Sequence, residues 1–304
     1  MEKMLIKKTS LRAALGAIAI ALLQPLPAAA AGGEHISIEK QRWSFSGFTG
    51  QYDKEQLQRG FRVYKDVCKA CHGLKRIAFR NLVQPGGPEF DEAAVKALAA
   101  SWDNKITDGP DEKGKMFERP AKLSDPILGP HKNENEARDT FNGALPPDLS
   151  IIVKARTIEP SAPWYTHIFL MARDILTGYQ EAGADYLYAL LMGYKDPPAG
   201  MQLGDGMSYK AAYPGHQIAM VQPIQPEGSV DYSKDDDGKP IANYAGPKMS
   251  MEQNARDVTA FLAWAADPSL NARKRIGWQV MLYLLVTTLL LYLAKKRIWA
   301  RVGH

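Results

Sequence analysis

The chain contains only two cysteines among its 304 residues, Cys68 and Cys71, and they stand three positions apart. A domain stapled by disulfides needs several cysteines at longer spacings, so this composition excludes a disulfide framework. The chain also lacks internal repeats, which excludes a solenoid. Alternation of apolar and polar residues, the pattern of half-buried strands, is scarce, and this disfavours an all-β fold.

The first 31 residues have the pattern of an export signal. Four basic residues precede an apolar run at 13–23, and the small-residue stretch 27–31 follows it. This order is typical of a cleavable signal peptide, which we predict at 1–31. An uncleaved anchor is the alternative, disfavoured because the apolar run is short for a membrane-spanning helix.

A second apolar run covers residues 278–294. Basic residues flank it at 273–275 and 295–297, and Trp278 and Trp299 stand near its ends. This pattern is typical of a single membrane-spanning helix, so we predict a transmembrane anchor and short cytoplasmic tail at 271–304. A buried helix of a soluble core is disfavoured because no later segment could cover it. Residues 32–270 are then the exported domain.

Net charge differs between these parts of the chain. The formal charge is +5 overall, of which residues 1–31 contribute +3 and residues 271–304 contribute +7, leaving −5 for residues 32–270. The apparent basicity therefore belongs to the targeting and membrane segments. An acidic exported domain attracts a basic partner and predicts no nucleic acid ligand.

The exported domain is predicted to consist of helices joined by long loops. Apolar residues at helical spacing predict helices over 54–68, 91–101, 134–141, 149–157, 164–176, 184–192 and 250–266. Residues 102–133 are predicted to be irregular, and residues 197–248 to form loops with a short hairpin, because Pro and Gly interrupt both segments. We therefore expect an all-α domain organised around a large group that replaces part of its core.

Cys68, Cys71 and His72 form the sequence Cys-Lys-Ala-Cys-His. Two thiols at this spacing reach the two vinyl groups of a haem, and the following histidine places an imidazole nitrogen on the iron. A thioredoxin-type redox pair needs a βαβ setting that this sequence lacks, and a zinc site needs two further ligands. The motif predicts one covalently attached haem c, with His72 as an iron ligand.

The ligand on the opposite side of the iron decides between an electron carrier and an enzyme. Met220 is a candidate because it lies in a loop stiffened by Pro and Gly, residues 213–223, late enough in the domain to close over the far haem face. His216 in the same loop is a rival ligand. Methionine opposite histidine raises the reduction potential relative to two nitrogen ligands, which suits a carrier, whereas an open position suits an enzyme.

Beyond the haem motif, the chain carries ordered motifs such as Met116-Phe-Glu-Arg-Pro and Asn142-Gly-Ala-Leu-Pro-Pro-Asp-Leu-Ser. Further motifs lie at 63–72, 108–110, 122–125, 154–156, 214–215, 218–220 and 261–266. Together they resemble the cytochrome c1 family of bacterial type, the haem subunit of the cytochrome bc1 complex, ubiquinol:cytochrome c oxidoreductase. The resemblance covers nearly the whole exported domain and the anchor, and it implies a cytochrome c-like haem domain with long loop insertions.

The resemblance also implies roles for individual residues. Met220 is then the sixth iron ligand, and Arg156 bonds a haem propionate, where a guanidinium offsets a partly buried carboxylate. The resemblance further implies that six residues line the haem pocket: Asn142, Pro146, Pro147, Tyr186, Tyr213 and Ile218.

Residues 158–184 form a longer segment than in mitochondrial relatives, as happens in bacterial ones. No cysteine is left to staple this segment. We therefore expect packing of Trp164, Phe169 and Leu170 to hold it in place.

By resemblance, the chain passes single electrons by outer-sphere transfer. Quinol oxidised at the cytochrome b subunit is the source, the Rieske iron-sulfur protein the donor, and a soluble or membrane-tethered cytochrome c the acceptor. The complex is expected to be dimeric and to lie in the bacterial inner membrane, with this chain single-pass and its haem domain in the periplasm. Candidate residues for guiding a basic cytochrome c are Asp103, Asp108, Asp111, Glu112, Asp231 and the acidic run 235–237.

Two other functions stay open on the sequence. A free-standing membrane-anchored c-type cytochrome would use the same ligands but would purify without b-type haems. A haem peroxidase would need an open or displaceable sixth position.

Overall fold

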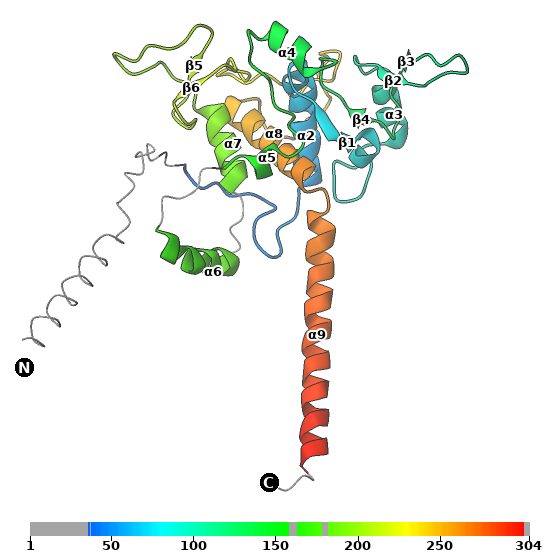
Figure 1. Cartoon of the computed structure of the whole chain (residues 1–304), viewed down its shortest axis with the longest axis vertical. Coiled ribbons are helices and arrows are strands. Elements are labelled where there is room, and N and C mark those ends of the chain that lie inside the picture. Colours follow the sequence, from blue (N-terminus) through cyan, green and yellow to red (C-terminus); the bar gives the residue numbers. More distant parts are fainter. Residues whose placement is uncertain (1–35, 37, 158–162, 178–181, 301–304) are drawn as a thin grey trace, which may run out of the picture. The chain divides into compact units, whose positions relative to one another are not determined.

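The computed structural model describes residues 36, 38–157, 163–177 and 182–300, and the predicted signal peptide at 1–31 lies outside them (Figure 1). The described chain is mostly helical, which confirms the expected fold class. The helices are α2 (Lys54–Asp66), α3 (Glu92–Ala100), α4 (Glu134–Thr140), α5 (Ile152–Ala155), α6 (His167–Thr177), α7 (Ala182–Met192), α8 (Met251–Ala266) and α9 (Leu270–Trp299).

The crossing of α2 and α8 forms the centre of the buried core. The Asp53 side chain caps α2 by accepting a hydrogen bond from the Gln56 backbone, so the helix begins at Lys54. The buried Phe61 ring packs edge-on against Phe261 of α8, with centroids 5.5 Å apart. Gly60 allows this close approach, because a Cβ there would overlap the Asp257 backbone oxygen.

Helices α5 and α7 pack against α8 from the side, as the ribbon shows (Figure 1). The buried residues of α7 include Ala184, Tyr186 and Leu190, and they join one apolar cluster with those of α2 and α8. The long loops pack against this cluster.

Three small antiparallel sheets brace the loops. Strand β1 (Leu74–Ala78) pairs with β4 (Pro126–Ile127), β2 (Ile106–Asp108) with β3 (Phe117–Arg119), and β5 (Ser208–Tyr209) with β6 (Gln217–Ile218). The last pair confirms the hairpin expected within 197–248. The strands at 106–108 and 117–119 correct the expectation that 102–133 is irregular. They are too short for a periodic pattern to reveal them.

The helix expected over 149–157 is wrong in length, because α5 spans only Ile152–Ala155. Asp148, which immediately precedes the expected helix, accepts hydrogen bonds from the Lys75 backbone at 2.8 Å and the Ser150 backbone at 3.0 Å. Its carboxylate therefore ties the segment to β1, and the helix starts later.

The first described residues pack against the junction of α8 and α9. Trp43 donates to Asp185 of α7 at 2.8 Å, and the Tyr52 hydroxyl donates to the Ala263 carbonyl of α8 at 3.0 Å. Lys274 in α9 donates to the carbonyls of Phe45 at 2.7 Å and Gly50 at 2.9 Å. These contacts connect the start of the domain to the start of the long C-terminal helix.

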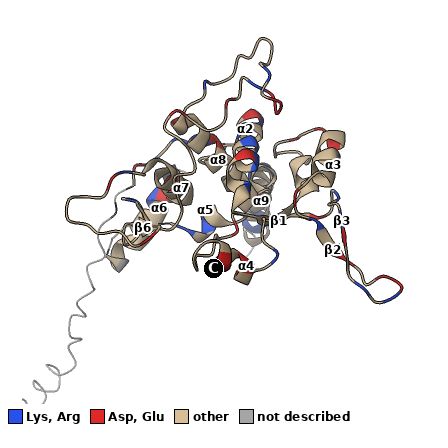
Figure 2. Ribbon diagram, turned by 90° about the horizontal axis from the view of Figure 1, so that it is seen from above, with Lys and Arg blue, Asp and Glu red and all other residues tan. Residues whose placement is uncertain are grey.

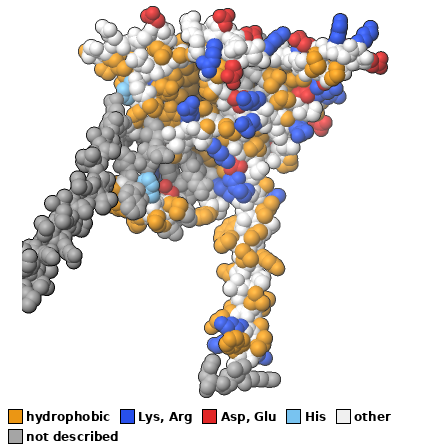
Figure 3. Space-filling model, in the orientation of Figure 1, with side chains coloured by type: hydrophobic (Ala, Val, Ile, Leu, Met, Phe, Trp, Pro, Cys, Tyr) orange, Lys and Arg blue, Asp and Glu red, His pale blue; other side chains and the backbone are white. Residues whose placement is uncertain are grey.

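Helix α9 has 30 residues, enough for about 45 Å at roughly 1.5 Å per residue. A bilayer core of about 30 Å needs fewer, so α9 is long enough to cross it with basic ends in the headgroups. Its apolar side chains are exposed, and Figure 3 shows some of them along the face of α9 that it draws. The chain thus has a C-terminal helix that fits a single-pass membrane anchor, beginning earlier than the apolar run at 278–294.

The packing expected for the inserted segment is wrong for Phe169, which is 74% exposed. Ile168 and Met171 on the same helix are exposed as well. A helical period identifies an apolar face but not what covers it. The side chain of Trp164 lies outside the described residues.

Candidate haem-binding site

The Cys-Lys-Ala-Cys-His motif occupies the turn that ends α2. Val67 caps the helix, and a 3-10 helix, Cys68–Ala70, tightens the chain immediately afterwards. The backbone N–H groups of Cys71 and His72 both donate to the Cys68 carbonyl, at 3.1 Å and 2.9 Å. This turn brings two thiols and one imidazole into a single compact group.

His72 has a defined ring orientation. Its Nδ1 lies 2.7 Å from the Pro147 carbonyl oxygen, an acceptor that requires the proton on Nδ1. The lone pair is then on Nε2, the nitrogen that could bind a metal. The Tyr64 hydroxyl donates to the His72 carbonyl at 3.0 Å, and the Leu149 backbone donates to the Gly73 carbonyl at 2.9 Å.

Burial sets the protonation of these groups. It raises the pKa of the Cys68 thiol to about 12 and also raises the pKa of Cys71. A thioredoxin-type pair needs a lowered thiol pKa, so the environment disfavours that interpretation. Burial lowers the pKa of His72, which favours the neutral ring that metal binding requires. Over the described ranges, no group of three or more His, Cys, Asp or Glu could hold zinc.

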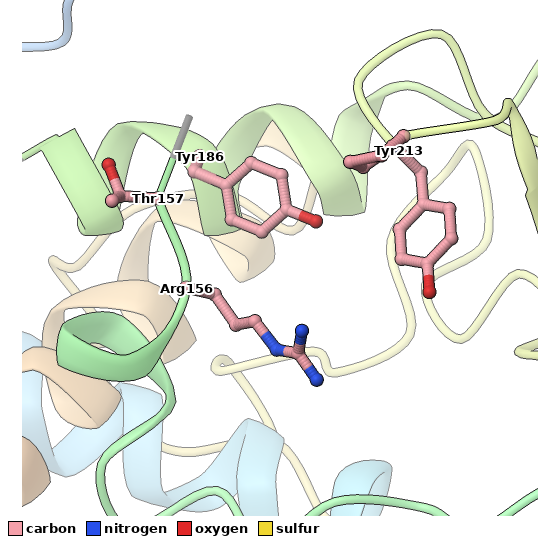
Figure 4. Close-up of a pocket in the computed structure, with 5 residues that line it drawn as sticks. Arg156, Thr157, Tyr186 and Tyr213 are labelled. Carbon is pink, nitrogen blue, oxygen red and sulfur yellow. The ribbon is translucent and has the colours of Figure 1, made fainter. Parts of the chain in front are cut away.

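A pocket of about 200 Å³ lies beside α7, lined by Arg156, Thr157, Tyr186, Tyr213 and Pro214. The guanidinium of Arg156 and the rings of Tyr186 and Tyr213 approach it from three separate segments (Figure 4). The structure thus brings together three of the residues predicted to line one site. A cation and two phenols are groups that can bind a carboxylate.

Met220 lies two residues beyond β6, just after the hairpin. It is half-buried and packs against the apolar core, as do Tyr213 and Ile218. The Tyr194 hydroxyl donates to the backbone oxygens of Met220 and Val221, each at 3.0 Å. The backbone that carries the Met220 thioether is therefore tied to the segment that follows α7.

His216 stands at the turn of the same hairpin, with φ +56°. Its Nδ1 lies 3.1 Å from the Lys210 carbonyl, and its ring lies 5.7 Å from the Tyr209 ring. These contacts hold the imidazole within its own hairpin.

Three predicted pocket residues lie on the turn between α4 and α5. Asn142 is exposed with φ +50°, Pro146 is half-buried, and Pro147 provides the carbonyl that orients His72. The structure therefore joins this turn to the haem motif through the Pro147 backbone.

Sequence reasoning missed Lys210, whose side chain is completely buried. Its ammonium donates to the Leu190 carbonyl and lies 3.0 Å over the Tyr194 ring. Burial lowers its pKa to about 7. Lys210 therefore supports the ring whose hydroxyl holds the Met220 backbone, and no local motif signals this long-range contact.

The residues present fit a covalently attached porphyrin. Two thiols and an imidazole lie on one turn, a backbone carbonyl fixes the ring, a thioether lies on a later loop, and a guanidinium lines a pocket. This donor set is the one that a c-type haem needs.

Several acidic candidates for partner docking are engaged within the chain. Asp103 pairs with Lys69 at 2.8 Å, Asp231 with Lys234 at 3.2 Å, and Asp236 with Lys65 at 2.6 Å. Acidic and basic residues alternate along the loops rather than separating by sign (Figure 2). Any attraction for a basic partner would therefore come from the net charge of −5 on residues 32–270 rather than from one unpaired acidic residue.

Comparisons with known proteins match nearly the whole described chain. The model of the Cytochrome C1 family matches residues 43–302. Cytochrome c1 of Blastochloris viridis is 44% identical over 277 residues, covering 91% of each chain. The mitochondrial heme protein cytochrome c1 of Schizosaccharomyces pombe is 36% identical over 271 residues, covering 89% of this chain and 75% of that one.

A longer relative combines two names. The cytochrome b/c1 of Bradyrhizobium diazoefficiens is 44% identical over 260 residues, which cover 85% of this chain and 35% of that protein. This chain therefore spans about a third of the length of that relative.

Proposed function

This chain belongs to the cytochrome c1 family, and on that premise we propose that it is the electron-transfer haem subunit of a cytochrome bc1 complex. Family members carry one covalently bound haem c. The observation that carries the proposal is the turn at Cys68, Cys71 and His72, with Nδ1 of His72 held by the Pro147 carbonyl.

We assign the site residues as follows. Cys68 and Cys71 would hold the haem through two thioether bonds, and His72 and Met220 would bind its iron. Arg156 bonds a propionate, and the side chains lining the pocket are Asn142, Pro146, Pro147, Tyr186, Tyr213 and Ile218. The haem, when bound, supplies a one-electron ferric/ferrous couple.

The protein's own groups determine how that couple behaves. The Pro147 carbonyl orients the imidazole, the Tyr194 hydroxyl holds the backbone of Met220, and the apolar cluster excludes water. With both His72 and Met220 bound to it, the iron would have no position for a substrate, so electrons would pass by outer-sphere transfer. This arrangement supports a carrier over a peroxidase.

The partners follow from the family. Cytochrome b oxidises quinol, the Rieske iron-sulfur protein delivers the electron, and a soluble or tethered cytochrome c accepts it. The chain is then one part of a dimeric quinol:cytochrome c oxidoreductase, and the chain itself is the carrier. Export by a signal peptide at 1–31 would put residues 32–270 in the bacterial periplasm and leave the tail after α9 in the cytoplasm.

Purification in mild detergent tests the assembly. One c-type and two b-type haems in the reduced-minus-oxidised spectrum, with an iron-sulfur subunit present, are the expected result. A lone c-type haem would favour the free-standing carrier. A high-spin spectrum, or carbon monoxide binding at ordinary concentration, would favour the peroxidase.

A further inference from the structure

Helix α6 exposes an apolar face that the electron-transfer role leaves unexplained. Ile168 is 76% exposed, Phe169 74% and Met171 60%. Along the helix, Ile168, Met171 and Ala172 recur at the helical period, and Phe169 lies beside them on the same side. This set of residues is called the α6 stripe below.

The opposite side of α6 is polar. It carries His167, Arg173 and Asp174, with Leu170 as the exception. Arg173 pairs with Asp174 at 2.7 Å, so the polar side carries little net charge. A helix divided in this way is typical of a site between an apolar and an aqueous phase.

The chain that leads to α6 starts at the base of the membrane anchor. Lys154 of α5 pairs with Asp267 at 3.1 Å, and Asp267 pairs with Arg273 of α9 at 2.6 Å. Eleven positions lead from Arg156 to His167, the first residue of α6, so α6 begins within about 37 Å of Arg156 at roughly 3.4 Å per residue. Figure 1 shows α6 on the side of the haem domain from which α9 departs.

We propose that α6 lies flat in the headgroup region of the membrane that α9 crosses, with the α6 stripe against the acyl chains. Its 11 residues span about 17 Å, too short to cross a core of about 30 Å. The basic residues Arg273, Lys274 and Arg275 mark the level where α9 enters the headgroups. The anchor holds the domain at this surface, so even modest affinity of α6 suffices.

This proposal needs only that α9 spans the membrane, and it goes beyond the electron-transfer function. It adds a second membrane contact, which would restrict tilting of the haem domain about α9. An environment-sensitive probe on each side of α6 can detect the contact.

The experiment uses full-length holoprotein in phosphatidylcholine vesicles. Cys68 and Cys71 are consumed by thioether bonds, so one introduced cysteine reacts alone. Ile168→Cys places a nitrobenzoxadiazole label in the α6 stripe, and Asp174→Cys places it on the polar side as the matched control. We expect brominated lipid chains to quench the label at 168 at least twofold, and aqueous iodide to quench only the label at 174.

Three results would overturn the proposal. Equal iodide quenching at both positions would mean that the stripe faces water. Shielding of 168 from iodide without quenching by brominated lipid would mean that a protein surface covers it. Quenching of 168 that disappears as the protein is diluted among vesicles would mean that a second copy covers it.

The spectrum of the same samples separates this proposal from the functional one. A normal low-spin c-type spectrum with an unquenched label at 168 would reject the membrane contact alone. The double variant Ile168→Asp/Phe169→Asp provides a second test, because exposed positions tolerate charge without unfolding the domain. We expect unchanged haem content but iodide access for a label at Met171→Cys in that background.

Discussion

Nδ1 of His72 lies 2.7 Å from the carbonyl oxygen of Pro147, although the two residues are 75 positions apart. The acceptor belongs to the backbone, so no side-chain substitution removes it directly. Its position depends on the Pro146-Pro147 pair, whose rings restrict φ at two successive residues. Ring orientation at the haem motif therefore depends on the stiffness of a distant turn.

Pro147→Gly should loosen this acceptor while leaving both thioether bonds intact. We expect haem-stained gels to show full covalent attachment, because Cys68 and Cys71 are unchanged. The free energy of unfolding should fall by about 1 kcal/mol, since glycine enlarges the unfolded ensemble. When the hydrogen bond from Nδ1 to the carbonyl weakens, the imidazole of His72 donates less electron density to the iron. The ferric state is then less stabilised, so the midpoint potential should rise. Pro198→Gly, in an exposed loop, should leave that potential unchanged.

Met220→Leu tests the sixth ligand against its rival. Leucine keeps the volume but removes the sulfur, so we expect a high-spin spectrum, carbon monoxide binding and a much lower midpoint potential. His216→Asn is the matched variant, because asparagine tolerates the φ of +56° at this position. It should leave the spectrum unchanged. If His216→Asn lost the low-spin spectrum and Met220→Leu kept it, His216 rather than Met220 would be the sixth iron ligand.

Arg156→Gln should lower the midpoint potential without changing the axial ligands. A guanidinium beside the pocket favours the reduced haem, which carries one less positive charge, and glutamine removes that effect. Arg156→Lys keeps the charge and should restore most of the potential. Potentiometric titration of the three proteins measures the difference in midpoint potential. Equal potentials would show that Arg156 does not interact with the haem.

Gly60→Ala should destabilise the crossing of α2 and α8. The added Cβ would overlap the Asp257 carbonyl oxygen and lie 2.6 Å from the Phe261 Cβ. Overpacking of this kind costs about 1–3 kcal/mol. Gly277→Ala is the control, because a Cβ there meets nothing within 4 Å. Denaturant titration followed by Soret circular dichroism should show a lower midpoint for Gly60→Ala alone.

Lys210 should make stability depend on pH. Burial lowers its pKa from 10.5 to about 7 in the folded protein, so the unfolded chain binds one more proton between these values. The free energy of unfolding of the natural protein, minus that of Lys210→Met, should therefore rise with pH between about 7 and 10.5. The rise should be up to about 1.4 kcal/mol per pH unit. Unfolding both proteins at several pH values from 6 to 10 measures the difference. A flat difference would mean that the ammonium stays charged throughout.

Local signals in the sequence predicted most of the helices. Asp53, Asp91 and Ser250 cap helices whose starts were expected within one residue of their observed positions. The haem motif was equally readable, because both thiols and the imidazole lie within five residues. Caps and short motifs depend on neighbours along the chain, so a sequence displays them fully.

Contacts between distant residues explain what the sequence did not reveal. Asp148 looked like the start of a helix, but its carboxylate bonds the backbone of Lys75. Lys210 lies in a segment predicted to form loops, yet its buried ammonium donates to the carbonyl of Leu190. Phe169 belonged to an apolar stripe, but the helical period indicates a face without identifying what covers it.

Hydrogen bonds connect Phe45, Gly50 and Tyr52, near the start of the domain, to the two C-terminal helices. The hydrogen bonds from Tyr52 to Ala263 and from Lys274 to Phe45 close loops of 211 and 229 positions. Loops of that length carry a large closure entropy and give the domain a high contact order. During synthesis, residues 45–52 cannot form these hydrogen bonds until almost the whole polypeptide, including α8 and α9, has been made. The contacts that complete this part of the fold can therefore form only after the C-terminal helices are available.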